Sequence, residues 1–291
     1  MAETKCGGVA GVKQDGHVVS VVIPTLGRET LVLVQDALGR QTRPADEVLI
    51  ILDRERQGIS WGHNTGILQA KGDLIAFIDD DAIPPNDWLE RLIHAFDAHG
   101  ADVAGGTFQE TDPLFDAIRR RRPMPDRILL DTGGWVGNGG NIMFARVVFD
   151  RLLQRDGYLF SETFKTSGED WELMGRVRRD GARAVYVPNP VRHLRRATSW
   201  HHCRHSFQRG VGIAKLFRFQ RQSSAHVIPQ DSLLWGQAGK KAPPRWFAAI
   251  WQKLVGPFDI GSFEKPQHFI VYWLGEKCQA LGFLWGLLTR G

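Results

Sequence analysis

Three consecutive aspartates, Asp79, Asp80 and Asp81, directly follow an apolar stretch at residues 74–78. Carboxylates this close repel one another, so the arrangement costs free energy unless a cation neutralises it. Mg²⁺ and Mn²⁺ prefer carboxylate oxygens together with water and phosphate oxygens, usually through one or two protein carboxylates. The triplet therefore predicts a divalent metal held against a nucleoside diphosphate. The structural alternative is an acidic turn that caps the next helix, which needs one aspartate rather than three.

A second acidic pair, Glu169 and Asp170, follows Ser167 and Gly168 and precedes an apolar run with helical spacing. Ser-x-x-Asp in this position is typical of a capping box. A carboxylate in a turn that begins with glycine is equally suited to act as a general base on an acceptor hydroxyl. The residues alone leave both interpretations open. His193, just past a predicted strand, offers a neutral imidazole that can complete a metal shell, although a lone histidine is more often structural.

The elements that must position these residues alternate between strand-like and helix-like runs. Near-continuous apolar strands separated by helices predict a parallel sheet covered on both faces. In such sheets ligands bind beyond the carboxyl ends of the strands, which is where the acidic triplet lies. No Gly-x-Gly-x-x-Gly follows the first strand and no P-loop motif occurs, which argues against dinucleotide enzymes and P-loop phosphotransferases. The predicted strands are 18–24, 48–52, 74–78, 103–104 and 184–187, and the predicted helices are 31–38 and one introduced by Pro84-Pro85-Asn86.

Composition is typical of a globular protein of 291 residues, with three widely separated cysteines and a net charge of +5. An odd number of cysteines implies no disulfide framework and favours a reducing compartment. Residues 181–230 contain no Asp or Glu but nine Arg and Lys. This segment suits a phosphate-bearing partner or an anionic membrane surface, or is a solvated basic face. Residues 1–15 lack the apolar run of a signal peptide, and Glu276 and Lys277 interrupt the apolar stretch 269–288, so no membrane-spanning helix is expected.

Six short motifs, taken in their order and spacing, resemble glycosyltransferase family 2, whose members have the GT-A fold. The resemblance covers about residues 18–220. It implies an α/β protein with a mixed sheet flanked by helices, to which this chain adds a helical C-terminal extension. The motifs are Val-Val-Ile-Pro-Thr at 21–25, Asp53, Asn-Thr-Gly-Ile at 64–67 with Ala-x-Gly-Asp at 70–73, Phe-Ile-Asp-Asp-Asp at 77–81, Gly-Glu-Asp at 168–170 and Val-x-His at 191–193.

The resemblance also implies an activity and a set of site residues. The activity is inverting transfer of a hexosyl group from a nucleotide-diphosphate sugar, most commonly UDP-linked, with Mn²⁺ or Mg²⁺ as cofactor. Asp170 would be the catalytic base, and Asp81 would bind the metal with His193 as a second ligand. Glu169 and Trp171 would lie on the acceptor side. The donor-binding residues would be Pro24, Thr25, Asp53, Asn64, Asp79, Asp80 and Asn141.

Some residues depart from the family pattern. Many members carry two aspartates followed by Gly-Ser after the second strand, where this chain has Asp-Arg-Glu-Arg at 53–56, and many have Arg in place of His63. The Gln-x-x-Arg-Trp motif of processive synthases is absent, so transfer of a single sugar is expected. We expect a flexible N-terminus at 1–17, a GT-A domain at 18–222 with its nucleotide-binding half ending near residue 105, and a helical, Trp-rich tail at 223–291.

The C-terminal tail and the basic segment at 181–230 indicate which partners the protein could bind. Residues 246–254 carry aromatic and aliphatic side chains at helical spacing, flanked by cations. Such a stripe lies in a lipid headgroup layer or packs on the catalytic domain or on a second copy in a homodimer. Membrane binding would suit a lipid-linked acceptor, the other expectation being a soluble glycan acceptor. We expect a cytoplasmic protein, either soluble or peripheral at the cytoplasmic face of the membrane.

Three rival interpretations follow from the residues. A nucleotidyltransferase would use similar aspartates but needs a glycine-rich phosphate loop, for which only Gly27-Arg28 is available. A non-catalytic basic module that binds anionic lipid or nucleic acid leaves the acidic triplet unexplained, so nucleic acid is an unlikely partner. A zinc site at His201, His202, Cys203 and His205 lacks the second ligand pair of a structural site.

Overall fold

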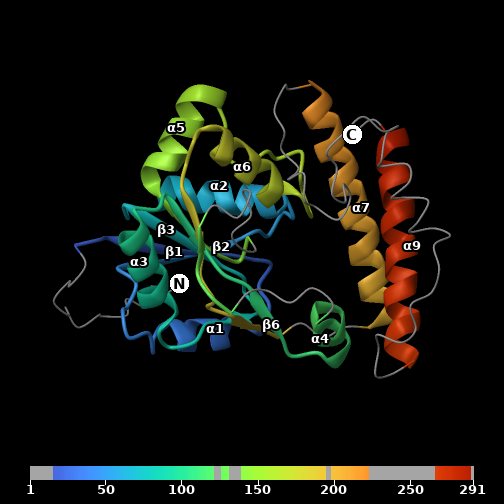
Figure 1. Cartoon of the computed structure of the whole chain (residues 1–291), viewed down its shortest axis with the longest axis horizontal. Helices are drawn as coiled ribbons and strands as arrows, with labels where there is room; N and C mark the ends of the chain where they lie inside the picture. The colour runs from blue at the N-terminus through green and yellow to red at the C-terminus, as the bar shows by residue number, and fades with distance from the viewer. Residues whose placement is uncertain (1–15, 121–125, 131–138, 195–197, 223–265, 290–291) are drawn as a thin grey trace.

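The computed structural model describes residues 16–120, 126–130, 139–194, 198–222 and 266–289. Two β-sheets and eight α-helices make up this part of the chain (Figure 1). The strands are β1 (Val19–Thr25), β2 (Glu47–Leu52), β3 (Leu74–Ile78), β4 (Ala82–Ile83), β5 (Val103–Gly105), β6 (Phe108–Glu110), β7 (Leu129–Leu130), β8 (Asn141–Ala145), β9 (Ala184–Tyr186) and β10 (Val191–His193). The helices are α1 (Leu31–Leu38), α2 (Ile59–Gln69), α3 (Trp88–His99), α4 (Pro113–Arg120), α5 (Arg146–Asp156), α6 (Glu169–Arg179), α7 (Ser199–Gln222) and α9 (Pro266–Leu288).

The larger sheet has seven strands in the order β2-β1-β3-β8-β5-β9-β7. The five strands predicted from apolar runs are confirmed as β1, β2, β3, β5 and β9, and helix 31–38 is confirmed as α1. The prediction of a parallel sheet is wrong at its centre, because β8 runs antiparallel to both of its neighbours, β3 and β5. The mixed α/β architecture is therefore the GT-A type that the motifs imply.

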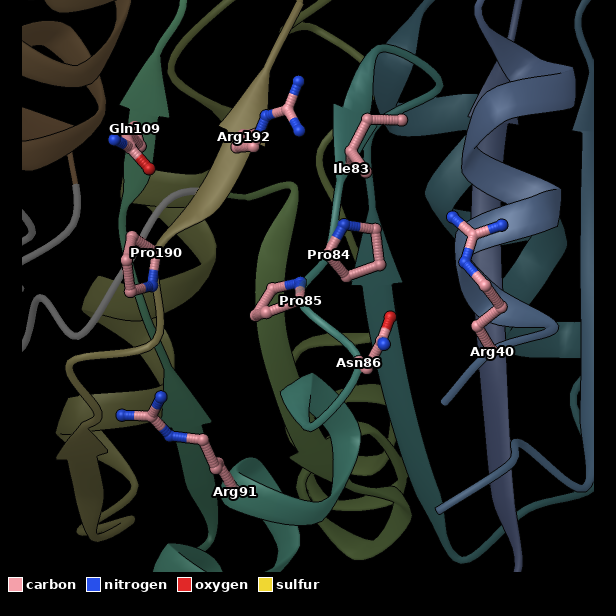
Figure 2. A pocket seen from close by; sticks show the side chains of 9 residues that line it. All are labelled: Arg40, Ile83, Pro84, Pro85, Asn86, Arg91, Gln109, Pro190 and Arg192. Carbon is pink, nitrogen blue, oxygen red and sulfur yellow. The ribbon is translucent and has the colours of Figure 1, made fainter. Parts of the chain in front are cut away.

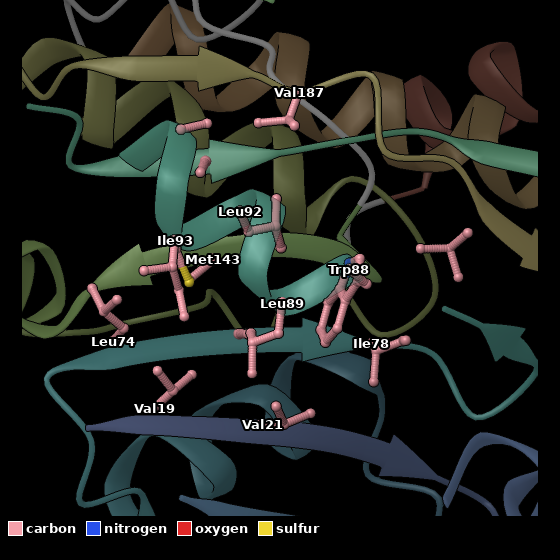
Figure 3. Packing of buried hydrophobic residues seen from close by; sticks show 14 of the residues in the cluster. Val19, Val21, Leu74, Ile78, Trp88, Leu89, Leu92, Ile93, Met143 and Val187 are labelled. Atoms are coloured by element: carbon pink, nitrogen blue, oxygen red, sulfur yellow. The ribbon is translucent and has the colours of Figure 1, made fainter. Parts of the chain in front are cut away.

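Helices cover both faces of this sheet, which explains why β1 and β3 are buried along their whole length. On one face α3 contributes Leu89 and Leu92 to a buried cluster that also holds Val19 and Val21 of β1 (Figure 3). Helices α2, α5 and α6 cover the other face (Figure 1). Each fully buried leucine or valine side chain contributes about 1.5–3 kcal/mol. This core fixes the carboxyl ends of β1 and β3, where the acidic triplet begins.

A smaller sheet of three strands, β4-β10-β6, continues from the triplet. Helix α3 starts only after β4, the strand that follows the triplet, and its N-cap is Asp87. The alternative interpretation of the triplet as a helix cap is therefore wrong. Strand β10 pairs antiparallel with β4 and parallel with β6, so that it brings His193 beside Ala82.

Helices α7 and α9 lie side by side along one flank of the molecule (Figure 1). They run in the same direction, since Gly275 of α9 contacts His202 and Gly286 contacts Ala214. Their backbones approach closely at Gly282, where an added Cβ would lie 2.0 Å from the carbonyl oxygen of Phe207. Within the described residues, no helix is long and apolar enough to span a bilayer. The stripe at 246–254 lies outside the described residues.

Candidate active site

The first acidic cluster is formed by Asp79, Asp81 and His193, whose ligand atoms all lie within 4.8 Å of one another. Asp79 follows the last residue of β3, and Asp81 precedes β4. His193 ends β10, and the next residue, Leu194, donates its N–H to the carbonyl oxygen of Asp81 at 2.8 Å. Two strands that are distant in sequence therefore bring two carboxylates and one imidazole to one point.

The imidazole of His193 is fixed on three sides. Its Nε2 lies 3.2 Å from Oδ1 of Asp81, and its Nδ1 lies 3.1 Å from Oε2 of Glu110. Its ring stacks on Phe108 with centroids 4.6 Å apart. Burial alone would lower the pKa of His193, but the two carboxylates outweigh burial and raise that pKa to about 9. A histidine that gives one ring nitrogen to a carboxylate and turns the other to a cluster has the environment of a metal ligand.

The carboxyl of Asp79 has a perturbed pKa. Burial and the charges of Asp81 and Asp80 raise its pKa to about 6, against the opposing charges of His193 and Arg28. Cations stand close by, since Nη1 of Arg28 lies 3.3 Å from Oδ1 of Asp80 and also contacts Asp81. Two carboxylates and one imidazole in a site that attracts positive charge match the donor set of Mn²⁺ or Mg²⁺.

The second acidic cluster is the pair Glu169 and Asp170 at the first turn of α6. Gly168 is the N-cap, with φ of 100°, and no side chain caps the helix. The capping-box interpretation of Ser167 and Asp170 is therefore wrong. Burial raises the pKa of both carboxyls, and the charges of Asp170 and Asp79 raise that of Glu169 further. For Asp170 the N–H of Trp171, at 2.9 Å from Oδ1, and the charge of Arg209 oppose the rise in pKa.

A glycine pair just before β8 separates the two clusters. An added Cβ on Gly140 would lie 2.2–2.4 Å from the carboxyl atoms of Asp79, which leaves no room for any side chain. An added Cβ on Gly139 would lie 3.5 Å from Cβ of Asp170, an ordinary contact. The backbone at 139–140 is thus sandwiched between the metal-type cluster and the carboxyl pair. The two clusters face the same small region beyond the carboxyl end of β3.

Known proteins share this arrangement of sequence and fold. Residues 45–155 match the sequence model of glycosyl transferase family 2. The matched stretch therefore resembles this family over residues 45–155. Glycosyltransferase AglE of Haloferax volcanii is 38% identical over 68 residues, which are 23% of this chain and 22% of that protein. The glucosyl-dolichyl phosphate glucuronosyltransferase of the same organism is 34% identical over 88 residues, which are 30% of this chain and 27% of that protein.

The match to these two relatives is local, since it spans about a quarter of their length. The fold match is broader. The mannosyltransferase PcManGT of Pyrobaculum calidifontis, solved with GDP-Man and Mn²⁺, has a TM-score of 0.58 at 15% identity, over 92% of this chain and 87% of that one. At this identity the likeness supports the GT-A fold.

The family 2 donor-binding residues expected on β1 and β2 lie at one edge of the sheet. Pro24 is buried against Gly62. Thr25 donates its hydroxyl to Oδ2 of Asp80 at 2.5 Å and so orients that carboxylate. Asp53 accepts the N–H groups of Gln57 and Gly58, at 2.9 and 2.8 Å, and closes its own loop. Thr25 and Asp53 thus shape the edge that a family 2 donor would occupy.

Two residues expected to bind the donor have hydrogen bonds within the chain. Asn141 is fully buried, and its amide bonds Trp88 Nε1 and the carbonyl oxygens of Thr107 and Asn189. Asn64 bonds both the N–H and the carbonyl oxygen of Phe160, at 2.8 and 3.0 Å. No face of the Asn141 side chain reaches solvent in this structure, and direct donor contact by Asn141 stays a prediction. Asn141 holds β8 and the preceding glycines in position.

Several other residues shape the site or its surroundings, although no sequence motif predicts them. Glu110 on β6 is the partner of His193, and Gly140 makes room for Asp79. His63, 2% exposed, is packed between Phe77 and Phe160, and burial lowers its pKa to about 3. The only sequence signal for the close approach of the backbone at 139–140 to Asp79 is a glycine pair before a strand.

The zinc interpretation on α7 has no support in the structure. Among the described residues, the only group of three ligands that could hold a metal is Asp79, Asp81 and His193. His202 is buried beside Phe115 instead. Cys203 and Cys278 are free thiols that contact each other between α7 and α9.

Proposed function

We propose that this chain transfers a single sugar from a nucleotide-diphosphate sugar to an acceptor hydroxyl, with inversion at the anomeric carbon. The observation that carries the proposal is the meeting of the two acidic clusters at the carboxyl end of β3, one built for a cation and one built to hold a proton. Displacement of a nucleoside diphosphate from a sugar carbon needs a cation and a proton acceptor at the same time. One end must stabilise the departing diphosphate, and the other must accept the proton of the acceptor.

Asp79, Asp81 and His193 would hold the divalent metal, Mn²⁺ or Mg²⁺. When bound, such an ion supplies positive charge that stabilises the diphosphate as its bond to the sugar breaks. Glu110 keeps the Nδ1 proton of His193, so that Nε2 stays directed at the cluster. Arg28, whose side chain is 54% exposed, can turn from Asp80 and Asp81 toward a donor phosphate.

Asp170 is the proposed base. It ionises before Glu169, because its carboxylate has a backbone N–H donor and the charge of Arg209, whereas Glu169 is also repelled by Asp79. Glu169 then remains protonated and can donate a hydrogen bond to the acceptor or to bound water. Its Oε2 forms no hydrogen bond within the described residues. Trp171, half-buried on the first turn of α6, would contact the acceptor.

The donor and acceptor classes rest on different arguments. A UDP-linked donor is proposed from the resemblance, while the PcManGT complex supports GDP-linked sugars as the second choice. A lipid-linked acceptor is proposed because one relative is named for a reaction on glucosyl-dolichyl phosphate. The basic segment at 181–230 would then meet the anionic surface that carries such an acceptor, as a peripheral contact.

Loss of the metal site is the direct test of the proposal. Asp81→Ala should weaken Mn²⁺-dependent binding of UDP or GDP by about a hundredfold or more and abolish hydrolysis of the matching nucleotide sugar, because one carboxylate ligand and its hold on His193 are gone. Isothermal titration with Mn²⁺ and with EDTA measures this. Asp36→Ala, at an exposed position of α1, is the matched control and should bind as the wild type does. Unchanged affinity in Asp81→Ala would remove Asp81 from the site.

A further inference from the structure

A groove of about 500 Å³ lies on the outer face of the small sheet (Figure 2). Residues from the three strands form a row across it, since Arg192 of β10 stands between Ile83 of β4 and Gln109 of β6. Side chains alternate between the two faces of a strand. Arg192 is therefore exposed in the groove, while its neighbour His193 is buried on the other face with the metal-type cluster. The groove is thus separate from the site of sugar transfer.

The floor of the groove is apolar and stiff. Pro84 and Pro85 follow β4, Pro190 precedes β10, and Ile83 lies beside Pro84 (Figure 2). Proline rings have a fixed backbone φ and lose no side-chain freedom when a ligand covers them. A rigid apolar floor of this kind suits the ring or the alkyl portion of a small molecule.

The rim of the groove is cationic. Arg40, just after α1, Arg91 of α3 and Arg192 all line it, and no carboxylate does. Arg91 is held in place, because it donates to the carbonyl oxygen of Pro188 at 2.7 Å and lies 3.8 Å from Asp87. The guanidinium groups of Arg40 and Arg192 form neither a hydrogen bond nor an ion pair with any residue that the structure describes. Arg40 and Arg192 are thus two like charges without an ion-pair partner among the described residues, which favours an anion.

We propose that this groove binds an organic phosphate, with the phosphate on Arg40 and Arg192 and the apolar portion on the proline floor. The guanidinium fork matches two phosphate oxygens and forms charge-assisted hydrogen bonds. A soluble phosphorylated metabolite and a phospholipid headgroup share this chemistry. Because no carboxylate lines the groove, binding there needs no metal, which distinguishes it from donor binding at the first acidic cluster. The proposal does not depend on the activity proposed above.

Phenyl phosphate is the probe, titrated into the full-length chain in EDTA by calorimetry. We expect saturable binding to one site, and no binding of phenol. Arg40→Gln combined with Arg192→Gln should weaken binding at least about tenfold, because two charge-assisted contacts are lost. Arg127→Gln removes an exposed arginine elsewhere and should bind as the wild type does. Asp81→Ala should also leave phenyl phosphate binding intact, which keeps this test distinct from that of the donor site.

A second experiment distinguishes a phospholipid headgroup from a soluble phosphorylated metabolite. Co-sedimentation with phosphatidylcholine vesicles, with and without phosphatidic acid, is compared for the wild type and the double arginine variant. Sedimentation that needs both phosphatidic acid and the two arginines supports a lipid headgroup. Phenyl phosphate binding without such sedimentation supports a soluble metabolite. Phenyl phosphate that fails to bind at millimolar concentration, or that binds the double variant equally well at an unchanged melting temperature, overturns the proposal.

Discussion

The two acidic clusters that meet at residues 139–140 differ in what surrounds their charge. In the first cluster, Arg28 and His193 stand within ion-pairing distance of Asp81. In the second cluster, Asp170 has a backbone N–H and the more distant charge of Arg209, and Oε2 of Glu169 has no hydrogen-bond partner in the described part of the chain. Burial raises the pKa of carboxyls in both clusters.

This difference shows how one fold prepares carboxylates for opposite tasks. Where cations already balance the charge, the carboxylates can exchange those cations for a metal with little change in total charge. Where burial acts with little compensation, a carboxyl holds its proton more strongly and becomes a better base. The two environments are kept apart by a backbone without side chains. Substitutions in the first cluster should therefore change metal and nucleotide binding, and substitutions in the second cluster should change the transfer rate or the pH dependence of stability.

The largest expected effect follows from removing the base. Asp170→Asn keeps the size of the side chain and its ability to accept the N–H of Trp171, but it removes the proton acceptor. The rate of sugar transfer should fall by about a hundredfold or more, while donor affinity and melting temperature change little. Transfer rate, nucleotide titration and thermal unfolding are measured on the same preparation.

Glu169→Gln is the control for that variant, because a protonated carboxyl and an amide are both neutral and both donate a hydrogen bond. Its transfer rate should stay within about tenfold of the wild type. If Glu169→Gln abolishes transfer and Asp170→Asn does not, Glu169 is the base and the roles of the pair are reversed.

An intermediate effect is expected from filling the space between the clusters. Gly140→Ala introduces a Cβ 2.2–2.4 Å from the carboxyl of Asp79, so that this proposed metal ligand must move. Affinity for Mn²⁺ should fall by about tenfold or more, since small displacements of a ligand carry a large cost in coordination geometry. Gly139→Ala is the matched control, because its Cβ would make an ordinary 3.5 Å contact with Asp170. Equal Mn²⁺ affinity in the two alanine variants would show that the close approach does not matter.

Much of the site was visible in the sequence because its residue types are costly anywhere else. Three adjacent aspartates need a cation wherever they lie, so a metal site at residues 79–81 could be predicted before the fold was known, with Asp81 as the metal ligand and Asp79 expected on the donor instead. His193 could be added only through the family motifs. Glu110, the partner of His193, could not be predicted from the sequence. It reaches His193 only because β6 pairs with β10, which joins residues that are 83 positions apart.

Other features required the structure. The direction of β8 depends on which strands it joins, and a five-residue strand does not encode that in its sequence. Asn141 and Asn64 have side chains that suit donor binding and backbone clamping equally well, and only the structure shows their contacts with Trp88 and Phe160. Gly140 carries no side-chain signal at all, since its function is to leave space.

The smallest expected effect concerns stability rather than turnover, and it tests the second cluster alone. Burial and the charges of Asp170 and Asp79 raise the pKa of Glu169 well above 4.5 in the folded state. The folded protein then holds a proton that the unfolded chain releases, so the free energy of unfolding falls as the pH rises from about 4.5 through the folded-state pKa.

Glu169→Gln cannot release this proton, so its free energy of unfolding should decline less with pH. The variant and the wild type should be close in stability at pH 4, where both side chains are neutral, and the variant should be the more stable at pH 8. Urea unfolding in EDTA at both pH values measures the difference. Asp36→Asn, at an exposed carboxyl on α1, controls for the loss of one surface charge and should follow the wild type. Parallel pH profiles for Glu169→Gln and the wild type would mean that Glu169 is ionised in the folded state, and the contrast between the two clusters would then lose its physical basis.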